Sequence, residues 1–167
     1  KAIRRQRQMC IRDSYSFDYH VNYVELDPSK VSEEQPDFYL EEQAPHIVFT
    51  PYLRELRDEL AGDERNPIIL ARRFYDFVTT KVMYSFMREY FTIECIPEYC
   101  AINLKGDCGV QALLFITLCR MSGIPARWQS GLYVTKYYTG CHDWSQFYVA
   151  PYGWVFCLLY TSPSPRD

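Results

Sequence analysis

An apolar stretch with helical periodicity covers residues 108–121 of the 167-residue chain. Its apolar positions at helical spacing are Val110, Leu113, Leu114, Leu118 and Met121, with Thr117 on the same side, while Phe115 and Ile116 make the opposite side apolar too. A helix that is apolar on both sides belongs inside a domain. Asp107 is suited to cap its N-terminus, and Ser122-Gly123 before Pro125 ends it. The pattern therefore predicts a buried central helix.

Two further helices are predicted upstream by their start signals. Thr50-Pro51 and Asn66-Pro67 each place a capping residue before a proline at the first helical position. The apolar stripes that follow are Leu53, Leu56 and Leu60 in the first helix, and Leu70, Phe74, Phe77, Val78 and Val82 in the second. Residues 84–104 have no clear period, so we predict an aromatic-rich loop there, which could wall a substrate cleft.

Residues after the central helix alternate like strands. We predict strands over 126–134 and 142–150, a turn at 151–153 and a third strand from Trp154. On the second strand His142, Trp144, Gln146 and Tyr148 share one face. Helices followed by consecutive strands imply an α+β fold with an antiparallel sheet. We predict that the His142 face meets the start of the central helix, so that His142 comes within hydrogen-bonding reach of Cys108 and Trp144 packs beside it.

Cys108 lies on the first turn of the central helix, where the helix dipole favours a thiolate. The helix terminus contributes only about 0.3–1 kcal/mol, and the charge of Asp107 opposes it. A reactive thiolate therefore needs a cationic neighbour, for which histidine is the usual choice. Of the three histidines, His20 and His46 have the pattern of structural or solvated side chains, so His142 is the candidate.

Several motifs together resemble the transglutaminase-like cysteine enzyme superfamily over about residues 67–156. They are Gly106-Asp107-Cys108, Gly123-Ile124-Pro125-Ala126-Arg127, Cys141-His142-Asp143-Trp144 and Gly153-Trp154, preceded by the helix at 71–78. The resemblance implies a papain/transglutaminase-like core and a Cys-His-Asp triad with Cys108 as nucleophile and His142 as base. Its Asp should fall near position 158, which is Leu158, so we expect the third member to be absent from this chain.

The function implied is acyl transfer on peptide or carboxamide bonds, with hydrolysis by a peptidase or amidase favoured over transfer to an amine. The backbone N–H of Cys108 is the candidate oxyanion donor, and Asp107, Gly109 and Trp144 are expected to line the site. The alternative is a catalytically inactive transglutaminase-like domain that binds peptides or acts as a scaffold. Both hypotheses imply a peptide or protein partner and no cofactor.

The two ends of the chain resemble a translated DNA-sequencing adapter. Residues 9–13 can be encoded by ATG TGT ATA AGA GAC, and residues 157–162 by TGT CTC TTA TAC ACA TCT, which is the reverse complement of the same element in another frame. We therefore interpret 1–14 and 157–167 as artefact, 15–26 as a strand that an upstream β domain could supply, and 27–49 as a linker. Residues 50–156 are then a truncated transglutaminase-like core, in a fragment of a longer protein. Residues before Tyr15 and beyond about Phe156 are expected to pack poorly, apart from residual strand pairing that the apolar stretch from Leu158 to Tyr160 could form.

Charge and cysteine content exclude some function classes. The chain has 18 basic and 21 acidic residues; removing the six basic and two acidic residues of the adapter-like ends leaves 12 and 19, a net charge of −7. A domain with this negative net charge is a poor candidate for binding nucleic acid or an anionic membrane surface. Cys95 and Cys100 lack a second closely spaced pair, so no metal site is expected. The odd cysteine count outside the ends predicts free thiols, which slightly favours a cytoplasmic location.

Overall fold

The computed structural model describes residues 25–159. The α-helices are α1 (Pro51–Ala61), α2 (Pro67–Lys81), α3 (Ile96–Asn103) and α4 (Cys108–Met121); 3-10 helices cover η1 (Pro28–Lys30) and η2 (Tyr90–Thr92); the strands are β1 (Met83–Tyr84), β2 (Lys105–Gly106), β3 (Ala126–Val134), β4 (Thr139–Val149) and β5 (Gly153–Cys157). The strand predicted near residues 15–23 lies outside the described residues.

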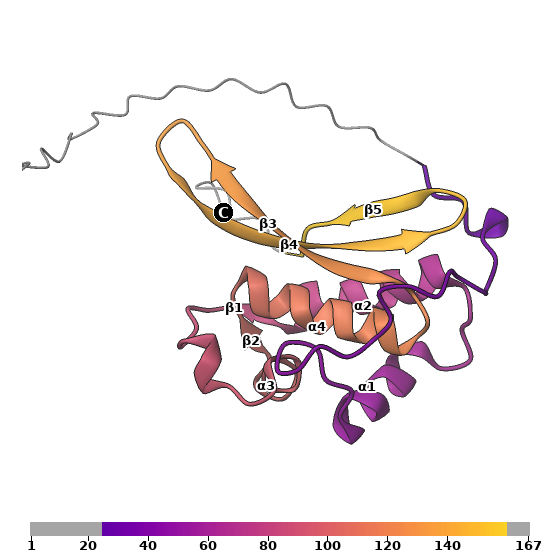
Figure 1. Ribbon diagram of the computed structural model, residues 1–167, viewed down its shortest axis with the longest axis horizontal. Coiled ribbons are helices and arrows are strands. Elements are labelled where there is room, and N and C mark those ends of the chain that lie inside the picture. Colours follow the sequence, from indigo (N-terminus) through magenta and orange to yellow (C-terminus); the bar gives the residue numbers. More distant parts are fainter. Residues whose placement is uncertain (1–24, 160–167) are drawn as a thin grey trace, which may run out of the picture.

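A three-stranded antiparallel sheet in the order β3-β4-β5 packs on the helices. Helix α4 runs beneath the sheet with α2 behind it, while α1 and α3 lie on the side of α4 away from the sheet (Figure 1). The short strands β1 and β2 pair in parallel beside the start of α4. The α+β class with an antiparallel sheet, expected from the order of helices and strands, is confirmed.

Local capping determines where three helices begin. The Thr50 hydroxyl accepts a hydrogen bond from the Leu53 N–H at 3.2 Å, and the Asn66 side chain accepts from the first turn of α2. Asp107 caps α4 in the same way. These caps satisfy backbone donors that the helix itself leaves free. All three predicted helix starts are confirmed.

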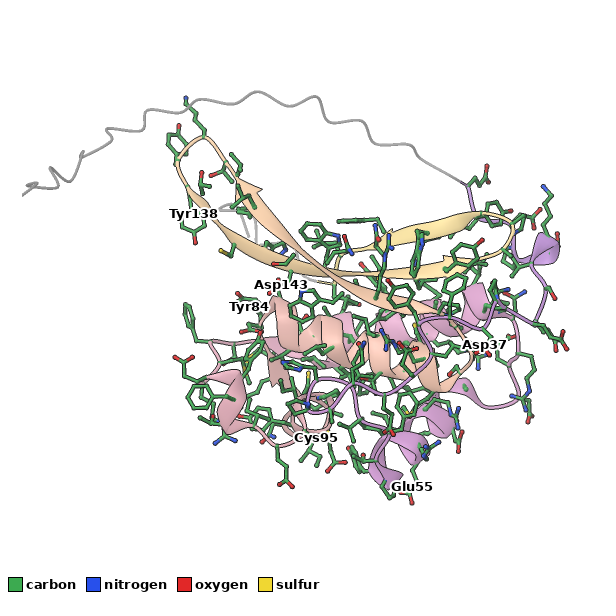
Figure 2. All side chains as sticks on the ribbon, in the orientation of Figure 1. Asp37, Glu55, Tyr84, Cys95, Tyr138 and Asp143 are labelled. Carbon is green, nitrogen blue, oxygen red and sulfur yellow. The ribbon has the colours of Figure 1, made fainter. Side chains whose placement is uncertain are left out.

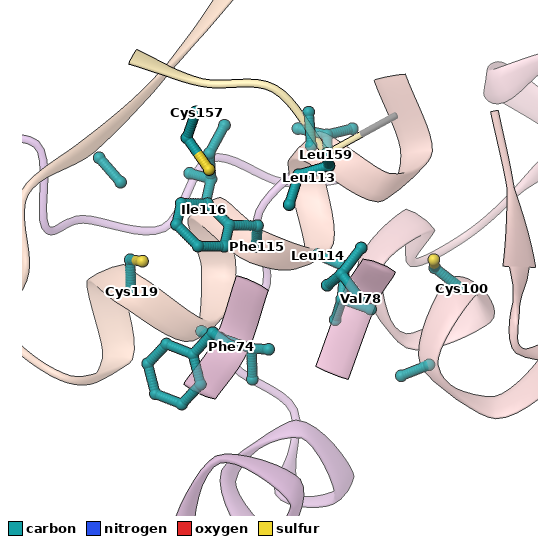
Figure 3. Packing of buried hydrophobic residues seen from close by; sticks show 14 of the residues in the cluster. Phe74, Val78, Cys100, Leu113, Leu114, Phe115, Ile116, Cys119, Cys157 and Leu159 are labelled. Carbon is teal, nitrogen blue, oxygen red and sulfur yellow. The ribbon is translucent and has the colours of Figure 1, made fainter. Parts of the chain in front are cut away.

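The hydrophobic core is built around α4, whose residues from Gly109 to Arg120 are all buried. Phe74 and Val78 of α2 approach it from one side, and residues of β4 and β5 cover it from the other (Figure 3). The rings of Phe115 and Phe147 meet at 6.0 Å between their centroids. Burial of this kind contributes about 1.5–3 kcal/mol for each large apolar side chain. The helix that carries Cys108 is therefore firmly fixed in place.

The region predicted as a loop between residues 84 and 104 contains η2 and the two-turn helix α3. Ile96, Cys100 and Ala101 of α3 are buried, so the helix packs on α4 without a clear polar face. The absence of an amphipathic period explains why the pattern did not reveal it. The rest of the region is irregular, as predicted, and brings Tyr90 to the start of α4.

The segment 27–49, predicted as a linker, lies against the domain. Arg120, near the end of α4 and only 4% exposed, holds it there by donating to the Glu41 carbonyl. The Arg120 Nε donates to the Ala126 carbonyl at 2.9 Å, so one guanidinium joins the segment to β3. The backbone N–H of Ala126 also donates to the Tyr39 carbonyl at 3.3 Å. Segment 41–47 thereby forms part of the wall around α4.

The expectation that residues beyond Phe156 pack poorly is wrong for two of them. Cys157 ends β5 opposite Ser145, whose hydroxyl donates to the Cys157 carbonyl at 3.1 Å. Cys157 and Leu159 are 7% and 6% exposed and join the core (Figure 3). Both are apolar and alternate inward along the chain, which explains their burial. Residues 1–14 and 160–167 lie outside the described part of the chain.

Candidate active site

Cys108 is the first residue of α4 and is half-buried. Asp107 precedes it, and its Oδ1 accepts the Val110 N–H at 2.9 Å. The cap leaves the sulfur at the N-terminal end of the helix, where backbone N–H groups point outward. The predicted position of the thiol at a capped helix start is confirmed.

Tyr90 of η2 holds Asp107 from the opposite side. Its hydroxyl donates to the same Oδ1 that caps the helix. Burial, followed by the hydrogen bond to Asp107 and the nearby charges, raises the pKa of Tyr90 above its ordinary value. Tyr90 therefore stays protonated and remains a hydrogen-bond donor at any physiological pH.

Three elements converge on Gly109, the residue after the cysteine. A Cβ added there would lie 2.5 Å from the Tyr90 hydroxyl oxygen, 2.7 Å from the Trp128 ring and 3.0 Å from an Asp143 carboxylate oxygen. None of these separations leaves room for a methyl group. Glycine at this position lets η2, β3 and β4 approach the start of α4 closely.

Strand β4 presents Asp143 to this site. The residues facing α4 are Asp143, Ser145, Phe147 and Val149, the last three of them buried. Figure 2 shows Asp143 between the sheet and the start of α4. The Asp143 backbone N–H is near enough to the Cys108 sulfur to lower the pKa of the thiol. The backbone of the predicted catalytic strand therefore does reach the thiol.

His142 occupies the other face of β4. Its ring lies against Tyr133 with 5.8 Å between centroids, and Trp144 packs over Gly131 and against Phe156. The sequence correctly groups His142 with Trp144, but the prediction that this face meets α4 is wrong. Burial of Phe147 against Phe115 sets which face points inward, and alternation then turns His142 outward. The structure does not bring the imidazole to Cys108, and its catalytic role stays a prediction.

Trp128, rather than Trp144, lies beside the thiol. Trp128 pairs with Ser145 across β3 and β4, so it shares the inner face of the sheet. Its ring closes over Gly109. The sequence patterns did not indicate Trp128, Tyr90 or Asp143 as site residues. Strand alternation groups Asp143 with Ser145, and Trp128 pairs with Ser145 across the strands, but the pattern does not tell that this face is the buried one.

The electrostatics of the site disfavour a resting thiolate. Burial raises the pKa of the Cys108 thiol, and the carboxylates of Asp143 and Asp107 raise it further, while backbone N–H groups of Asp143 and Gly109 lower it. The side-chain charges that act most strongly on the sulfur are thus negative. Cys108 needs a proton acceptor or a cation before it can act as a nucleophile at neutral pH.

The family profile described as the transglutaminase-like superfamily matches residues 54–157. The chain belongs to the transglutaminase-like superfamily. The match includes Cys108 and His142, so the resemblance found from the sequence motifs is confirmed. No curated protein matches the chain as a relative.

Solved structures support the fold of this superfamily member. The chain is similar to a candidate cysteine protease from Cytophaga hutchinsonii, with a TM-score of 0.66, 20% identity, and coverage of 80% of this chain and 47% of that one. It is also similar to the periplasmic domain of TgpA from Pseudomonas aeruginosa, with a TM-score of 0.59, 19% identity, and coverage of 72% and 45%. The chain therefore spans about half the length of each structure.

Three further properties concern residues 25–159 only. No group of three or more His, Cys, Asp or Glu side chains within this range could hold a metal ion. The cysteines described there are free thiols. None of the helices in the same range is long and apolar enough to span a membrane.

Proposed function

We propose that this superfamily member is a cysteine-dependent acyl-transfer enzyme that acts on peptide or carboxamide bonds of a peptide or protein, with water as the acceptor. The Cys108 sulfur forms a bond to the carbonyl carbon, the C–N bond breaks, and the amine leaves with a proton. Water then cleaves the thioester, which releases the acid and restores the thiol. Superfamily membership and similarity to a candidate cysteine protease support this proposal.

One observation carries the proposal: Cys108 is a half-buried thiol at a capped helix start, where the backbone N–H groups of Asp143 and Gly109 lower the pKa of the thiol. Such donors stabilise a negative charge on sulfur, and the helix-start N–H of Cys108 itself is the proposed oxyanion donor. Tyr90 and Asp107 hold the first turn of α4 in place. Asp107 and Gly109 line the site in this proposal, as expected from the sequence.

His142 remains the proposed base. Its neighbour Asp143 already contacts the Cys108 sulfur through the backbone, and adjacent Cα atoms are only about 3.8 Å apart. A one-residue bulge or register change in β4 would exchange the faces of these two residues and bring the imidazole to the thiol. In the arrangement described here, the Asp143 carboxylate occupies that place.

The pH dependence of Cys108 alkylation tests the assignment. Iodoacetamide labelling with peptide mapping gives the rate at Cys108, and Cys95 is a matched internal control because it is also half-buried at a helix start. If His142 activates the thiol, H142Q slows Cys108 alone and moves the rise of its alkylation rate to higher pH. If H142Q has no effect while D143N speeds labelling at neutral pH, His142 is not the base in this chain.

The raised pKa of Cys108 and the outward His142 ring favour a second candidate, a peptide-binding or scaffold domain without turnover. The two functions can be distinguished by one covalent product, a thioester on Cys108. Incubation with an activated ester gives a thioester on Cys108 only if the site performs acyl transfer. Peptide binding without any thioester would favour the scaffold.

A further inference from the structure

A pocket of about 450 Å³ opens beside the candidate active site. It is lined by Gln43, Ala44, His46, Ile47, Tyr90, Leu113 and Trp128. Its size is within the range of pockets that bind small ligands or single side chains. Most of its wall comes from segment 43–47, which precedes the part of the chain matched by the superfamily profile.

The pocket and the thiol share two walls. Tyr90 and Trp128 line the pocket, and the same two side chains close around Gly109, the residue next to Cys108. A substrate bonded to the Cys108 sulfur therefore lies directly beside the pocket.

The pocket wall has an apolar character with no carboxylate, lysine or arginine side chain. Ala44, Ile47, Leu113 and Trp128 supply its apolar surface. Two of its polar side chains are already engaged, since Gln43 accepts from Arg120 at 3.4 Å and Tyr90 donates to Asp107; His46 is the third polar residue of the wall. Since a charged group would have no partner of opposite fixed charge, its desolvation would be unfavourable there.

We infer that this pocket receives an uncharged apolar or aromatic side chain of the peptide substrate and makes the chemistry at Cys108 selective for such residues. The inference rests on the proposed function for its catalytic consequence, but binding to the pocket can be measured separately. Segment 43–47 is then the specificity-determining element. Arg120, which holds Gln43 and the Glu41 carbonyl, positions it.

The binding test is an NMR titration of the full chain with N-acetyl-L-phenylalanine amide and, in parallel, N-acetyl-L-aspartate amide. The first compound should shift the Trp128 indole and Leu113 signals with saturation, and the second should bind about tenfold or more weakly, because an apolar ring gains from burial and a carboxylate does not. A44W fills the pocket and should abolish the shifts. V134W, an exposed position on the β3–β4 hairpin, is the matched control and should leave them unchanged. Equal binding of both compounds, or shifts that survive in A44W, would overturn the inference.

The catalytic arm uses two alkylating reagents on the same proteins. N-benzyl iodoacetamide should label Cys108 about tenfold faster than the carboxylate reagent iodoacetylglycine; A44W should remove this preference, and V134W should keep it. Fast labelling of Cys108 by all reagents without preference leaves the proposed function standing and refutes the pocket's role. If no reagent labels Cys108 faster than Cys95, the proposed function fails, while the NMR titration still decides whether the pocket selects apolar groups.

Discussion

Replacing Gly109 by alanine should destabilise the protein, although alanine is the better helix former. The added Cβ would meet the Tyr90 hydroxyl at 2.5 Å and the Trp128 ring at 2.7 Å, with the Asp143 carboxylate at 3.0 Å. Tyr90 cannot retreat without losing its hydrogen bond to Asp107. Overpacking of this kind lowers the free energy of unfolding by about 1–3 kcal/mol. The higher helix propensity of alanine offsets at most about 1 kcal/mol of this loss. The expected net loss in the free energy of unfolding is about 1–2 kcal/mol.

Urea unfolding of the four proteins in a double-mutant cycle with Y90F measures this effect. Y90F deletes the atom closest to the added methyl group, so G109A should cost about 1 kcal/mol less in the Y90F background. Cys108 alkylation should also change in G109A, because the residues around its sulfur must move. Unchanged or increased stability of G109A in the parent background would refute the close approach of Tyr90, Trp128 and Asp143 to the start of α4.

The remaining predictions concern one buried cation, one helix cap and one charge. R120M removes the guanidinium whose hydrogen bonds to two backbone carbonyls join α4 to β3 and to segment 41–47. The free energy of unfolding, measured in urea, should fall by about 3 kcal/mol. A loss below about 1 kcal/mol would contradict this role. N66A removes the cap of α2 and should cost about 1 kcal/mol, seen as a lower midpoint of thermal unfolding. D107N keeps a capping oxygen but removes a negative charge that raises the pKa of Cys108; the pKa should fall, so alkylation at pH 7 should become faster. Slower labelling of D107N would show that the charge acts in the opposite sense.

Local signals in the sequence predict the helix starts well because a cap involves only neighbouring residues. Thr50, Asn66 and Asp107 each bond to N–H groups two or three positions ahead, which no distant contact can easily override. The position of Cys108 follows directly from such a cap. Helix α3 was not predicted, because its two turns are buried on more than one side and lack an amphipathic period.

Strand alternation predicts which residues share a face but not which face is buried. On β4 one face carries His142 and Trp144, while the other carries Asp143 and Phe147. Both contain an aromatic residue, so local hydrophobicity does not decide between them. The contact between Phe147 and Phe115 decides, and it joins residues 32 positions apart in the chain. Tyr90 likewise reaches Asp107 across 17 positions that include α3, a contact that no local pattern encodes.

Trapping of the acyl-enzyme tests whether Cys108 is the nucleophile of an acyl-transfer reaction. The full chain is mixed with the p-nitrophenyl ester of N-acetyl-L-phenylalanine, p-nitrophenolate release is followed, and the quenched protein is mapped by mass spectrometry. The account predicts a burst of p-nitrophenolate and a thioester on Cys108, both lost in C108A and both kept in C141A, which removes the exposed thiol. A thioester on Cys141 in place of Cys108, or the same release from C108A as from the parent, would contradict it.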